Sequence, residues 1–273
     1  MRIAYTGWTW LTHHKDNYRW EFEQFLKEVS YLGYDSVENF AFITDYFDSD
    51  ADAVNALLKK YNLDLVNMYL HFKDTPEIDY EKAVNFAEFM KKTKTPFMNL
   101  QGNMYEGDGA GNHPTDEAKI KGYAELSNKI GKLCKPAGIT PCFHPHWGTP
   151  VFTEAEIDIY EKYVDHDTVK LCIDTAHTAL AGMDPVKIIE KYGDLIGYMH
   201  LKDLDPDVTI RPERPLVRFL PLGQGTIDFS GVVKALKKAG YDGVLCVELD
   251  NSPVCNFKSA MDSREYIRGV LHM

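Results

Sequence analysis

The chain lacks several features that would point to membranes, secretion or nucleic acid. No apolar run approaches the roughly 20 residues of a membrane-spanning helix, and the N-terminus lacks the basic and then apolar pattern of a signal peptide. Basic residues are few, because 30 of them stand against 41 acidic ones and leave a net charge of −11. Such a charge repels phosphate backbones and anionic lipid. We therefore expect a cytoplasmic protein that acts on small neutral molecules.

Cysteine pairs with metal-binding or redox spacing are also absent. The five cysteines are odd in number, none of them forms a C-x-x-C motif, and three lie in apolar, strand-like runs. This usage predicts reduced, buried thiols rather than a disulfide framework.

What the sequence does contain is a regular alternation of short β-rich runs and longer segments of helical period. A chain of 273 residues with 44% hydrophobic content can bury one large core. The alternation predicts parallel strands joined by crossover helices, and eight such units predict an α/β fold, a (β/α)₈ TIM barrel formed by residues 1–273 as one domain. The expected strands are Arg2–Gly7, Ser36–Phe40, Leu63–His71, Pro96–Gln101, Ile139–His146, Val169–Asp174, Ile196–Leu201 and Val244–Leu249.

Apolar stripes mark the helices that should cover this barrel. Phe22, Phe25, Leu26 and Val29 fall at i, i+3, i+4 and i+7, and a second such stripe begins at Phe229. Asp228 is suited to cap the start of that second helix and Gly240 to end it. The longest irregular loop is expected at residues 203–227, after the seventh strand.

Four expected strands end in residues that bind metal ions. His144, Asp174, His200 and Glu248 close strands five to eight, and in such barrels the carboxyl ends of the strands meet on the face that holds the active site. A single His or Asp at a strand end is more often a cap or a surface group, but four at successive strand ends favour a metal site. Two imidazoles and two carboxylates suit one divalent ion, whether Mn²⁺, Co²⁺, Zn²⁺, Fe²⁺ or Mg²⁺.

Motifs in the C-terminal half make the chain similar to the xylose isomerase-like barrels, which include sugar phosphate isomerases and epimerases and inosose dehydratase. The segments that carry the resemblance are Ile173–His177, Met199–Asp203, Leu222–Phe229 and Val247–Glu248. The resemblance implies Asp174, His200 and Glu248 as metal ligands. The family's fourth ligand is usually a glutamate at the end of strand five, but here His144-Pro-His146 resembles the inosose dehydratase branch, and this implies His144 as the fourth ligand.

The resemblance also implies the reaction, which is proton abstraction next to a carbonyl. Glu248 is then the expected base, His177 a residue that contacts substrate and acts in catalysis, and Lys202 a group that stabilises an oxyanion or donates to a leaving hydroxyl. The alternatives are that His177 caps the next helix and that Lys202 is a solvated charge. Because His144 replaces one of the two glutamates that exchange protons in the epimerases, isomerisation and loss of water both stay open.

Other residues near strand ends are candidates for lining a carbohydrate or cyclitol pocket. These are Trp8, Glu38, His71, His146 and His177. Arg211, Arg214 and Arg218 in the loop after strand seven could hold a phosphate or could be solvated. The glycine-rich stretch from Gly223 to Asp228 lacks the preceding strand of a dinucleotide fingerprint, so a capped turn is expected there.

Two rival classes remain open at this point. An endonuclease IV-like barrel would carry three zinc ions and bind DNA, which the acidic composition argues against. A non-catalytic sugar-binding barrel would have broken metal ligands, whereas all four positions here can bind metal. Many members of the family are dimers or tetramers, so a homo-oligomer is possible.

Overall fold

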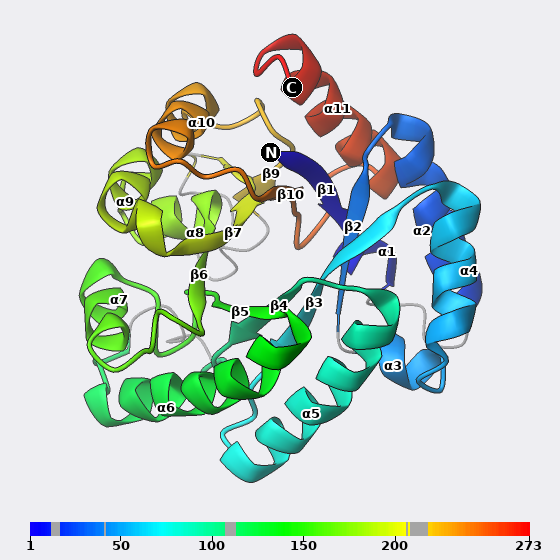
Figure 1. The fold of residues 1–273 in the computed structure, drawn as a ribbon. Helices are drawn as coiled ribbons and strands as arrows, with labels where there is room; N and C mark the ends of the chain where they lie inside the picture. The colour runs from blue at the N-terminus through cyan, green and yellow to red at the C-terminus, as the bar shows by residue number, and fades with distance from the viewer. Residues whose placement is uncertain (12–16, 41, 107–112, 206, 208–217) are drawn as a thin grey trace.

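The computed structural model describes residues 1–11, 17–40, 42–106, 113–205, 207 and 218–273. Eight parallel strands form a closed barrel in the order β1-β10-β7-β6-β5-β4-β3-β2, with helices around it (Figure 1). This confirms the predicted (β/α)₈ fold. The barrel strands are β1 (Arg2–Thr6), β2 (Ser36–Phe40), β3 (Asp64–His71), β4 (Phe97–Gln101), β5 (Thr140–Phe143), β6 (Lys170–Asp174), β7 (Ile196–Leu201) and β10 (Val244–Val247).

The strand boundaries agree with the predicted ones to within one residue at most ends. The largest difference is at β5, where pairing stops at Phe143 and His144 to His146 lie beyond the strand. Pro145 accounts for part of this early end, because proline has no N–H to donate to a neighbouring strand.

The helices form the outer ring and bury their predicted apolar stripes against the strands. Phe22, Phe25 and Val29 of α2 are fully buried, as is Phe229 of α10. The helices are α1 (Trp8–Leu11), α2 (Tyr18–Leu32), α3 (Phe42–Tyr46), α4 (Ala51–Tyr61), α5 (Pro76–Thr93), α6 (Glu117–Cys134), α7 (Glu154–Glu161), α8 (Thr175–Leu180), α9 (Pro185–Tyr192), α10 (Phe229–Lys238) and α11 (Asn256–Gly269). Short 3₁₀ turns at Lys135–Ala137 and Gly193–Leu195 lead into β5 and β7.

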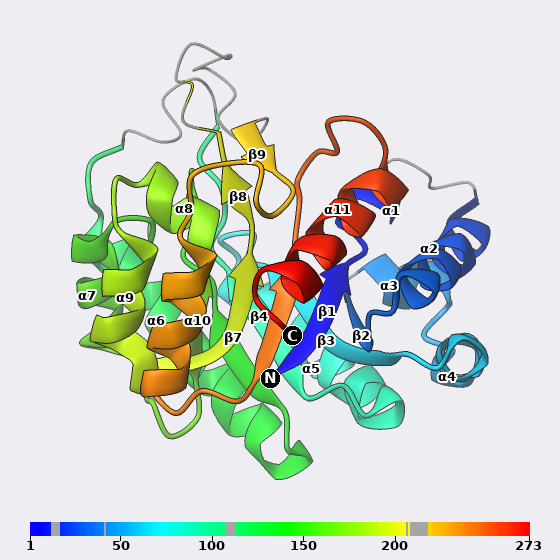
Figure 2. The same cartoon turned by 90° about the horizontal axis from the view of Figure 1, so that it is seen from above.

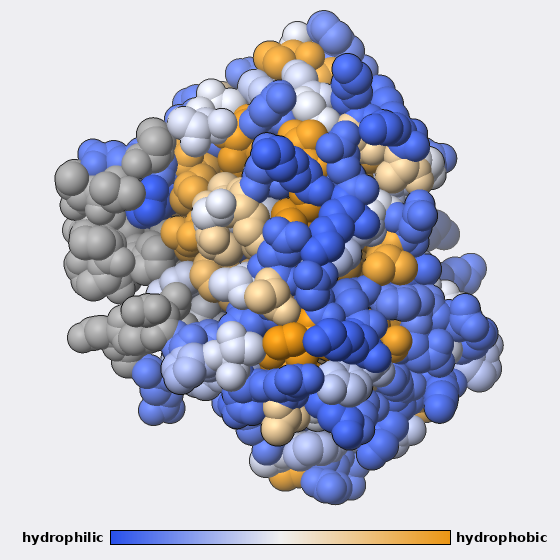
Figure 3. All heavy atoms as spheres, turned by 90° about the vertical axis from the view of Figure 1, so that its left-hand side faces the viewer, coloured by the Kyte–Doolittle hydropathy of each residue, from blue (hydrophilic) through white to orange (hydrophobic). Residues whose placement is uncertain are grey.

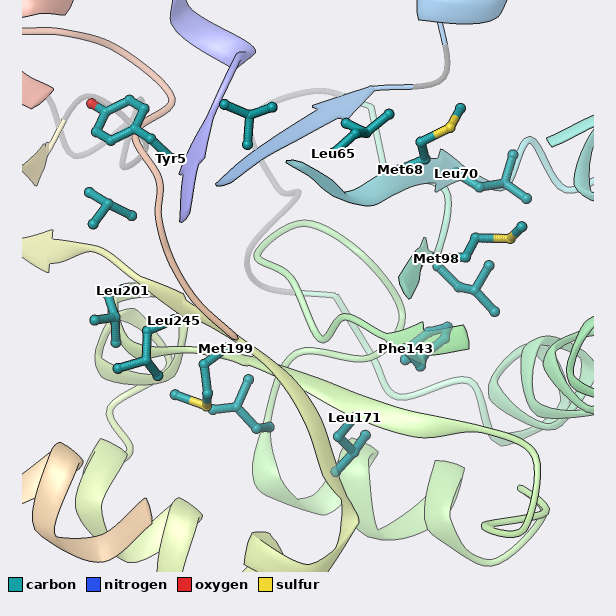
Figure 4. Packing of buried hydrophobic residues seen from close by; sticks show 14 of the residues in the cluster. Tyr5, Leu65, Met68, Leu70, Met98, Phe143, Leu171, Met199, Leu201 and Leu245 are labelled. Carbon is teal, nitrogen blue, oxygen red and sulfur yellow. The ribbon is translucent and has the colours of Figure 1, made fainter. Parts of the chain in front are cut away.

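Alternation along the strands divides the core into two parts. Leu171, Met199 and Leu245 belong to the large cluster that packs beneath the helices (Figure 4). Their neighbours Cys172, Tyr198 and Cys246 belong to a smaller cluster, because successive side chains of a strand point to opposite faces. The members of this smaller cluster are Ala4, Val66, Cys142, Cys172, Tyr198, Val244 and Cys246.

Four of the five thiols are buried, as the sequence predicted. The cysteines are unpaired, and Cys134, Cys142, Cys172 and Cys246 are buried while Cys255 is exposed. The burial explains why these thiols can stay reduced and unreactive, since desolvation raises the pKa of Cys142 and Cys246 well above the ordinary value.

The described parts of the segment after β7 contain regular structure. Asp203–Leu204 (β8) and Phe219–Leu220 (β9) pair as a small antiparallel sheet above the barrel (Figure 2). The Asp203 carboxylate accepts hydrogen bonds from the backbone N–H groups of Gly223, Gly225 and Ile227 at 2.8–3.1 Å. A side chain on Gly225 would clash with the Leu204 carbonyl oxygen, so the turn requires glycine there.

The glycine-rich stretch is therefore a turn held by a carboxylate, as predicted, and not a phosphate loop. Asp228 accepts from the Gly231 N–H at 2.8 Å as the N-cap of α10, and Gly240 follows that helix with a positive φ of 73°. Both predicted helix boundaries are thus confirmed.

The outer surface shown in Figure 3 is mainly hydrophilic, with hydrophobic residues in small scattered groups. Within the described residues, no helix is both long and apolar enough to cross a membrane.

Candidate metal centre and active site

Strand alternation brings the four predicted ligands to one side of the barrel. Each follows a member of the small interior cluster by two residues: Cys142 precedes His144, Cys172 precedes Asp174, Tyr198 precedes His200 and Cys246 precedes Glu248. Residues i and i+2 of a strand lie on the same face, so the side chains continue inward at the carboxyl ends of β5, β6, β7 and β10.

The four side chains converge as the sequence predicted. One ligand atom from each of His144, Asp174, His200 and Glu248 lies within 4.8 Å of the other three. His200 Nδ1 is 2.8 Å from Glu248 Oε2 and 3.8 Å from Asp174 Oδ2.

These donor atoms are buried, and apart from the 2.8 Å contact between His200 Nδ1 and Glu248 Oε2 they form no hydrogen bond with the described residues. They are His144 Nε2, Asp174 Oδ2, His200 Nδ1 and Glu248 Oε2. A buried polar group without a full set of partners costs about 1–3 kcal/mol in a protein interior, so four such atoms at one point favour a shared partner. Their nitrogen and oxygen chemistry fits a divalent metal ion, which agrees with the donor set predicted from the sequence.

Hydrogen bonds on the far sides of the ligands set their orientation. His144 Nδ1 lies 3.2 Å from the Cys172 carbonyl oxygen, to which only an N–H can bond, so the Nε2 lone pair faces the cluster. Asp174 accepts from the N–H groups of Ala176 and His177 through Oδ1, which leaves Oδ2 free. This arrangement also makes Asp174 the N-cap of α8.

Glu38 lies behind His200 and holds it from the other side. Its Oε2 atom is 2.8 Å from His200 Nε2 and accepts from the Asn99 amide at 3.4 Å. Glu38, Asn99 and His200 are all fully buried. The predicted role of Glu38 in lining the substrate pocket therefore needs revision, because its contacts are those of a carboxylate that orients a metal-binding histidine.

Lys202 lies within the cluster and is fully buried. Its Nζ is 2.7 Å from Asp250 Oδ2, 3.3 Å from Glu248 Oε2 and 3.4 Å from Asp174 Oδ2. Burial opposes its charge, but these three carboxylates outweigh burial and raise the pKa of Lys202, so the side chain stays an ammonium. The alternative of a solvated lysine does not hold.

The positive charge of Lys202 also affects the Glu248 carboxylate. Although burial favours the protonated form, Lys202 and His200 bring the pKa of Glu248 well below its ordinary value. Glu248 is consequently ionised, and with 5% of its surface exposed it is the most accessible of the four ligands.

His146 and His177 lie beside the cluster. Their rings are 3.8 Å apart between centroids, and the rings of His144 and His177 are 5.7 Å apart. His146 donates through Nδ1 to the Trp147 carbonyl oxygen at 2.6 Å, whereas His177 Nδ1 accepts from the Trp147 N–H at 3.4 Å. In the neutral rings, His146 thus keeps an Nε2 acceptor and His177 an Nε2 donor.

Burial keeps both imidazoles neutral, since it lowers the pKa of His146 to about 3 and that of His177 well below 6.5. The His177 Nε2 atom is buried without a hydrogen-bond partner. Nitrogen atoms of His144, His146 and His177 also lie within 4.8 Å of one another, a second grouping that shares His144 with the first.

A row of aromatic rings connects Trp8 with the ligands. Trp8 is 4.5 Å from Phe40, Phe40 is 4.9 Å from Tyr69, and Tyr69 stacks at 6.1 Å on His200. His71 joins the row at 4.8 Å from Tyr69, and burial lowers its pKa to about 4. The predicted pocket residues Trp8 and His71 thus lie along one wall near the metal cluster.

The contributors to the site that were not predicted include Asp250, Asn99, Tyr69 and Phe40. Asp250 follows Glu248 by two residues, so continuing the alternation past the strand end would have found it. Of the three arginines, Arg211 and Arg214 lie outside the described residues. Arg218 donates to the Asp205 carbonyl oxygen at 2.5 and 3.2 Å, which occupies part of its guanidinium.

Comparisons with known proteins agree with this geometry. Residues 26–269 match the family model described as xylose isomerase-like TIM barrel. The chain is 29% identical over 268 residues to the inosose dehydratase of Clostridium beijerinckii, covering 90% of this chain and 89% of that one. It is 27% identical to the inosose dehydratase of Geobacillus kaustophilus over 273 residues, covering 92% and 87%.

Solved structures show the same fold at lower identity. The IolI protein with a bound zinc atom superposes with a TM-score of 0.77 at 17% identity, covering 99% of this chain and 98% of that one. The probable 3-DHS dehydratase AsbF of Bacillus anthracis has a TM-score of 0.76 at 14% identity, covering 98% of both chains. The predicted resemblance and the prediction of an enzyme are confirmed, and the chain belongs to the xylose isomerase-like TIM-barrel family.

Proposed function

We propose that this protein is a divalent-metal-dependent dehydratase of a keto-cyclitol or a closely related keto sugar. The observation that carries the proposal is the convergence of four buried metal-binding atoms from His144, Asp174, His200 and Glu248. The inosose dehydratase relatives, which align with about nine-tenths of the chain, supply the substrate class.

A divalent ion held by these residues would polarise a substrate carbonyl or hydroxyl oxygen and so acidify the neighbouring C–H bond. Mn²⁺, Co²⁺, Zn²⁺, Fe²⁺ and Mg²⁺ all accept such a mixed nitrogen and oxygen set. Metal analysis of the purified protein would identify the ion.

Glu248 is the proposed base. It is ionised, is the most exposed of the four ligands, and can accept the proton from the carbon next to the carbonyl. Lys202 contributes a fixed positive charge 3.3 Å from Glu248, which stabilises negative charge that develops on the substrate. The Nε2–H of His177 and the Nε2 lone pair of His146 are suited to hold substrate hydroxyl groups.

The end of β5 favours dehydration over epimerisation. Epimerisation requires a second acid–base group that returns the proton on the opposite face of the carbon. His144 occupies that strand end, and its Nδ1–H is engaged by the Cys172 carbonyl while its Nε2 faces the other ligands. In a dehydration the proton taken by Glu248 can pass to the leaving hydroxyl, which departs as water, so one carboxylate suffices.

Proton NMR in D₂O tests this mechanism with inososes and keto sugars as substrates. We expect Mg²⁺- or Zn²⁺-loaded protein to exchange deuterium next to the carbonyl and to form an unsaturated or rearranged ketone with loss of water. Glu248→Gln should abolish both, whereas Glu190→Gln, a half-exposed carboxylate on α9, should leave them unchanged. Exchange with return to an epimer or isomer would overturn dehydration, and no exchange with any metal would overturn the enolisation mechanism.

Metal content separates the remaining alternatives. We expect about one ion per chain, held with an affinity that falls in His200→Ala. Three zinc ions per chain would favour an endonuclease IV-like centre, and none would favour a non-catalytic barrel.

A further inference from the structure

We propose that Asp250 is a positioning residue that controls metal affinity: it holds the Lys202 ammonium away from Asp174 and Glu248 and so keeps their oxygens open for a divalent ion. The inference rests on the metal site of the proposed function. It concerns competition between the Lys202 ammonium and a divalent metal ion for the same carboxylate oxygens.

Lys202 is fixed in place before any ligand enters. The Thr175 hydroxyl donates to the Lys202 carbonyl oxygen at 2.7 Å and accepts from its N–H at 3.0 Å. The ammonium lies 4.5 Å from the centre of the Phe219 ring, a cation–π contact, and the side chain is fully buried. The ammonium therefore cannot escape to solvent and must be neutralised inside the site.

Three carboxylates face this one ammonium, and the distances separate them into two kinds. Nζ donates a hydrogen bond to Asp250 Oδ2 at 2.7 Å. Glu248 Oε2 at 3.3 Å and Asp174 Oδ2 at 3.4 Å are within ion-pair distance of Nζ but accept no hydrogen bond from it, and Glu248 Oε2 is also 2.8 Å from His200 Nδ1. Asp250 thus holds the ammonium, while the two metal-binding oxygens stay available.

Without Asp250 the ammonium would turn to those oxygens. A movement of about 0.5 Å would shorten both contacts to ordinary charged hydrogen bonds, which lie near 2.8 Å. The two ligands would then be neutralised by Lys202, and a divalent ion would have to displace it. Removing Lys202 should have the opposite effect, because the carboxylates would lose their internal counter-ion and bind an added cation more tightly.

A double-mutant cycle on Mn²⁺ binding tests this, with the free ion measured by electron paramagnetic resonance. We expect Asp250→Asn to weaken Mn²⁺ binding about tenfold and Lys202→Met to strengthen it about tenfold, the scale seen when residues behind metal ligands are changed. In the Lys202→Met background, Asp250→Asn should change the affinity by less than about threefold, since Asp250 acts through the lysine. Asp250→Glu should restore part of the lost affinity.

Other outcomes would overturn the inference. If Asp250→Asn weakens binding equally in both backgrounds, Asp250 acts as an independent negative charge. If Lys202→Met leaves affinity unchanged or lowers it, the lysine does not compete with the ion. Lys202→Gln provides a second neutral variant should Lys202→Met fail to fold, and circular dichroism in EDTA checks the fold of each. A wild-type chain that binds no Mn²⁺, Co²⁺ or Zn²⁺ would overturn the proposed metal site as well, whereas an additive cycle would overturn only this inference.

Discussion

Glu161, which lies outside the metal cluster at the end of α7, should make the stability of the fold depend on pH. It ends α7 with 12% of its side chain exposed, and neither carboxylate oxygen has a hydrogen-bond partner among the described residues. Burial, followed by the negative charge of Asp158, raises the pKa of Glu161 from 4.5 to about 7 in spite of Lys170. The folded state therefore binds a proton more tightly than the unfolded chain, and this contribution to stability is lost as pH rises from 4.5 through 7.

The size of the effect follows from the shift. A change from 4.5 to about 7 corresponds to at most about 3 kcal/mol, and because water still reaches the site we expect roughly half of that. Glu161→Gln removes the titration, so the variant should gain this free energy of unfolding relative to wild type between pH 5 and pH 8.5.

Urea unfolding followed by circular dichroism, in EDTA so that metal binding does not contribute, measures the difference at each pH. Glu125→Gln, which neutralises an exposed carboxylate on α6, controls for the change in net charge. His166 Nε2 lies 3.2 Å from Glu161 Oε2, but burial lowers the pKa of His166 and so favours its neutral form where Glu161 ionises. A difference that stays constant across this pH range would refute the buried-carboxylate reasoning.

Three further predictions follow from single contacts. Glu38→Gln should weaken Mn²⁺ binding about 10- to 100-fold while the protein stays folded, because His200 loses the carboxylate that orients it; calorimetry that gives an unchanged affinity would contradict this. Asp203→Ala should lower the free energy of unfolding by about 3 kcal/mol, since four backbone N–H groups, including that of Leu204, lose their acceptor; urea unfolding that shows a loss below about 1 kcal/mol would mean that other acceptors replace it. Trp8→Ala should raise KM and leave kcat almost unchanged if this ring only binds substrate, and steady-state kinetics in which kcat falls instead would place it in the chemical step.

Most of the fold and the convergence of the four candidate metal ligands could be predicted because both depend on periodicity. A barrel strand is buried on both faces, so its apolar run is easy to recognise, and the residue at its carboxyl end must face the same edge as its equivalents. His144, Asp174, His200 and Glu248 each stand at such an end, and nothing about their placement depends on details of side-chain packing.

The contacts behind the ligands could not be predicted in the same way. Glu38 is on the expected strand, but its depth relative to His200 depends on how neighbouring strands are staggered, and the β2–β3 register shifts between Val37 and Glu38. A register shift of this kind does not change the pattern of apolar residues in the sequence. The sequence therefore indicated that Glu38 lies near the site but not that it faces the back of a ligand.

The role of Asp250 was not predicted from the sequence for a related reason. Asp250 lies past the end of β10, where pairing no longer enforces alternation, yet its side chain still reaches inward to Lys202. A barrel of this family needs several carboxylates at one point, and ionised carboxylates repel one another when no cation is present. Lys202 supplies that cation in the metal-free protein, and the 2.7 Å contact with Asp250 keeps it from occupying the ligands. The same residues thus stabilise the site without a metal ion and leave Asp174 and Glu248 available to bind one.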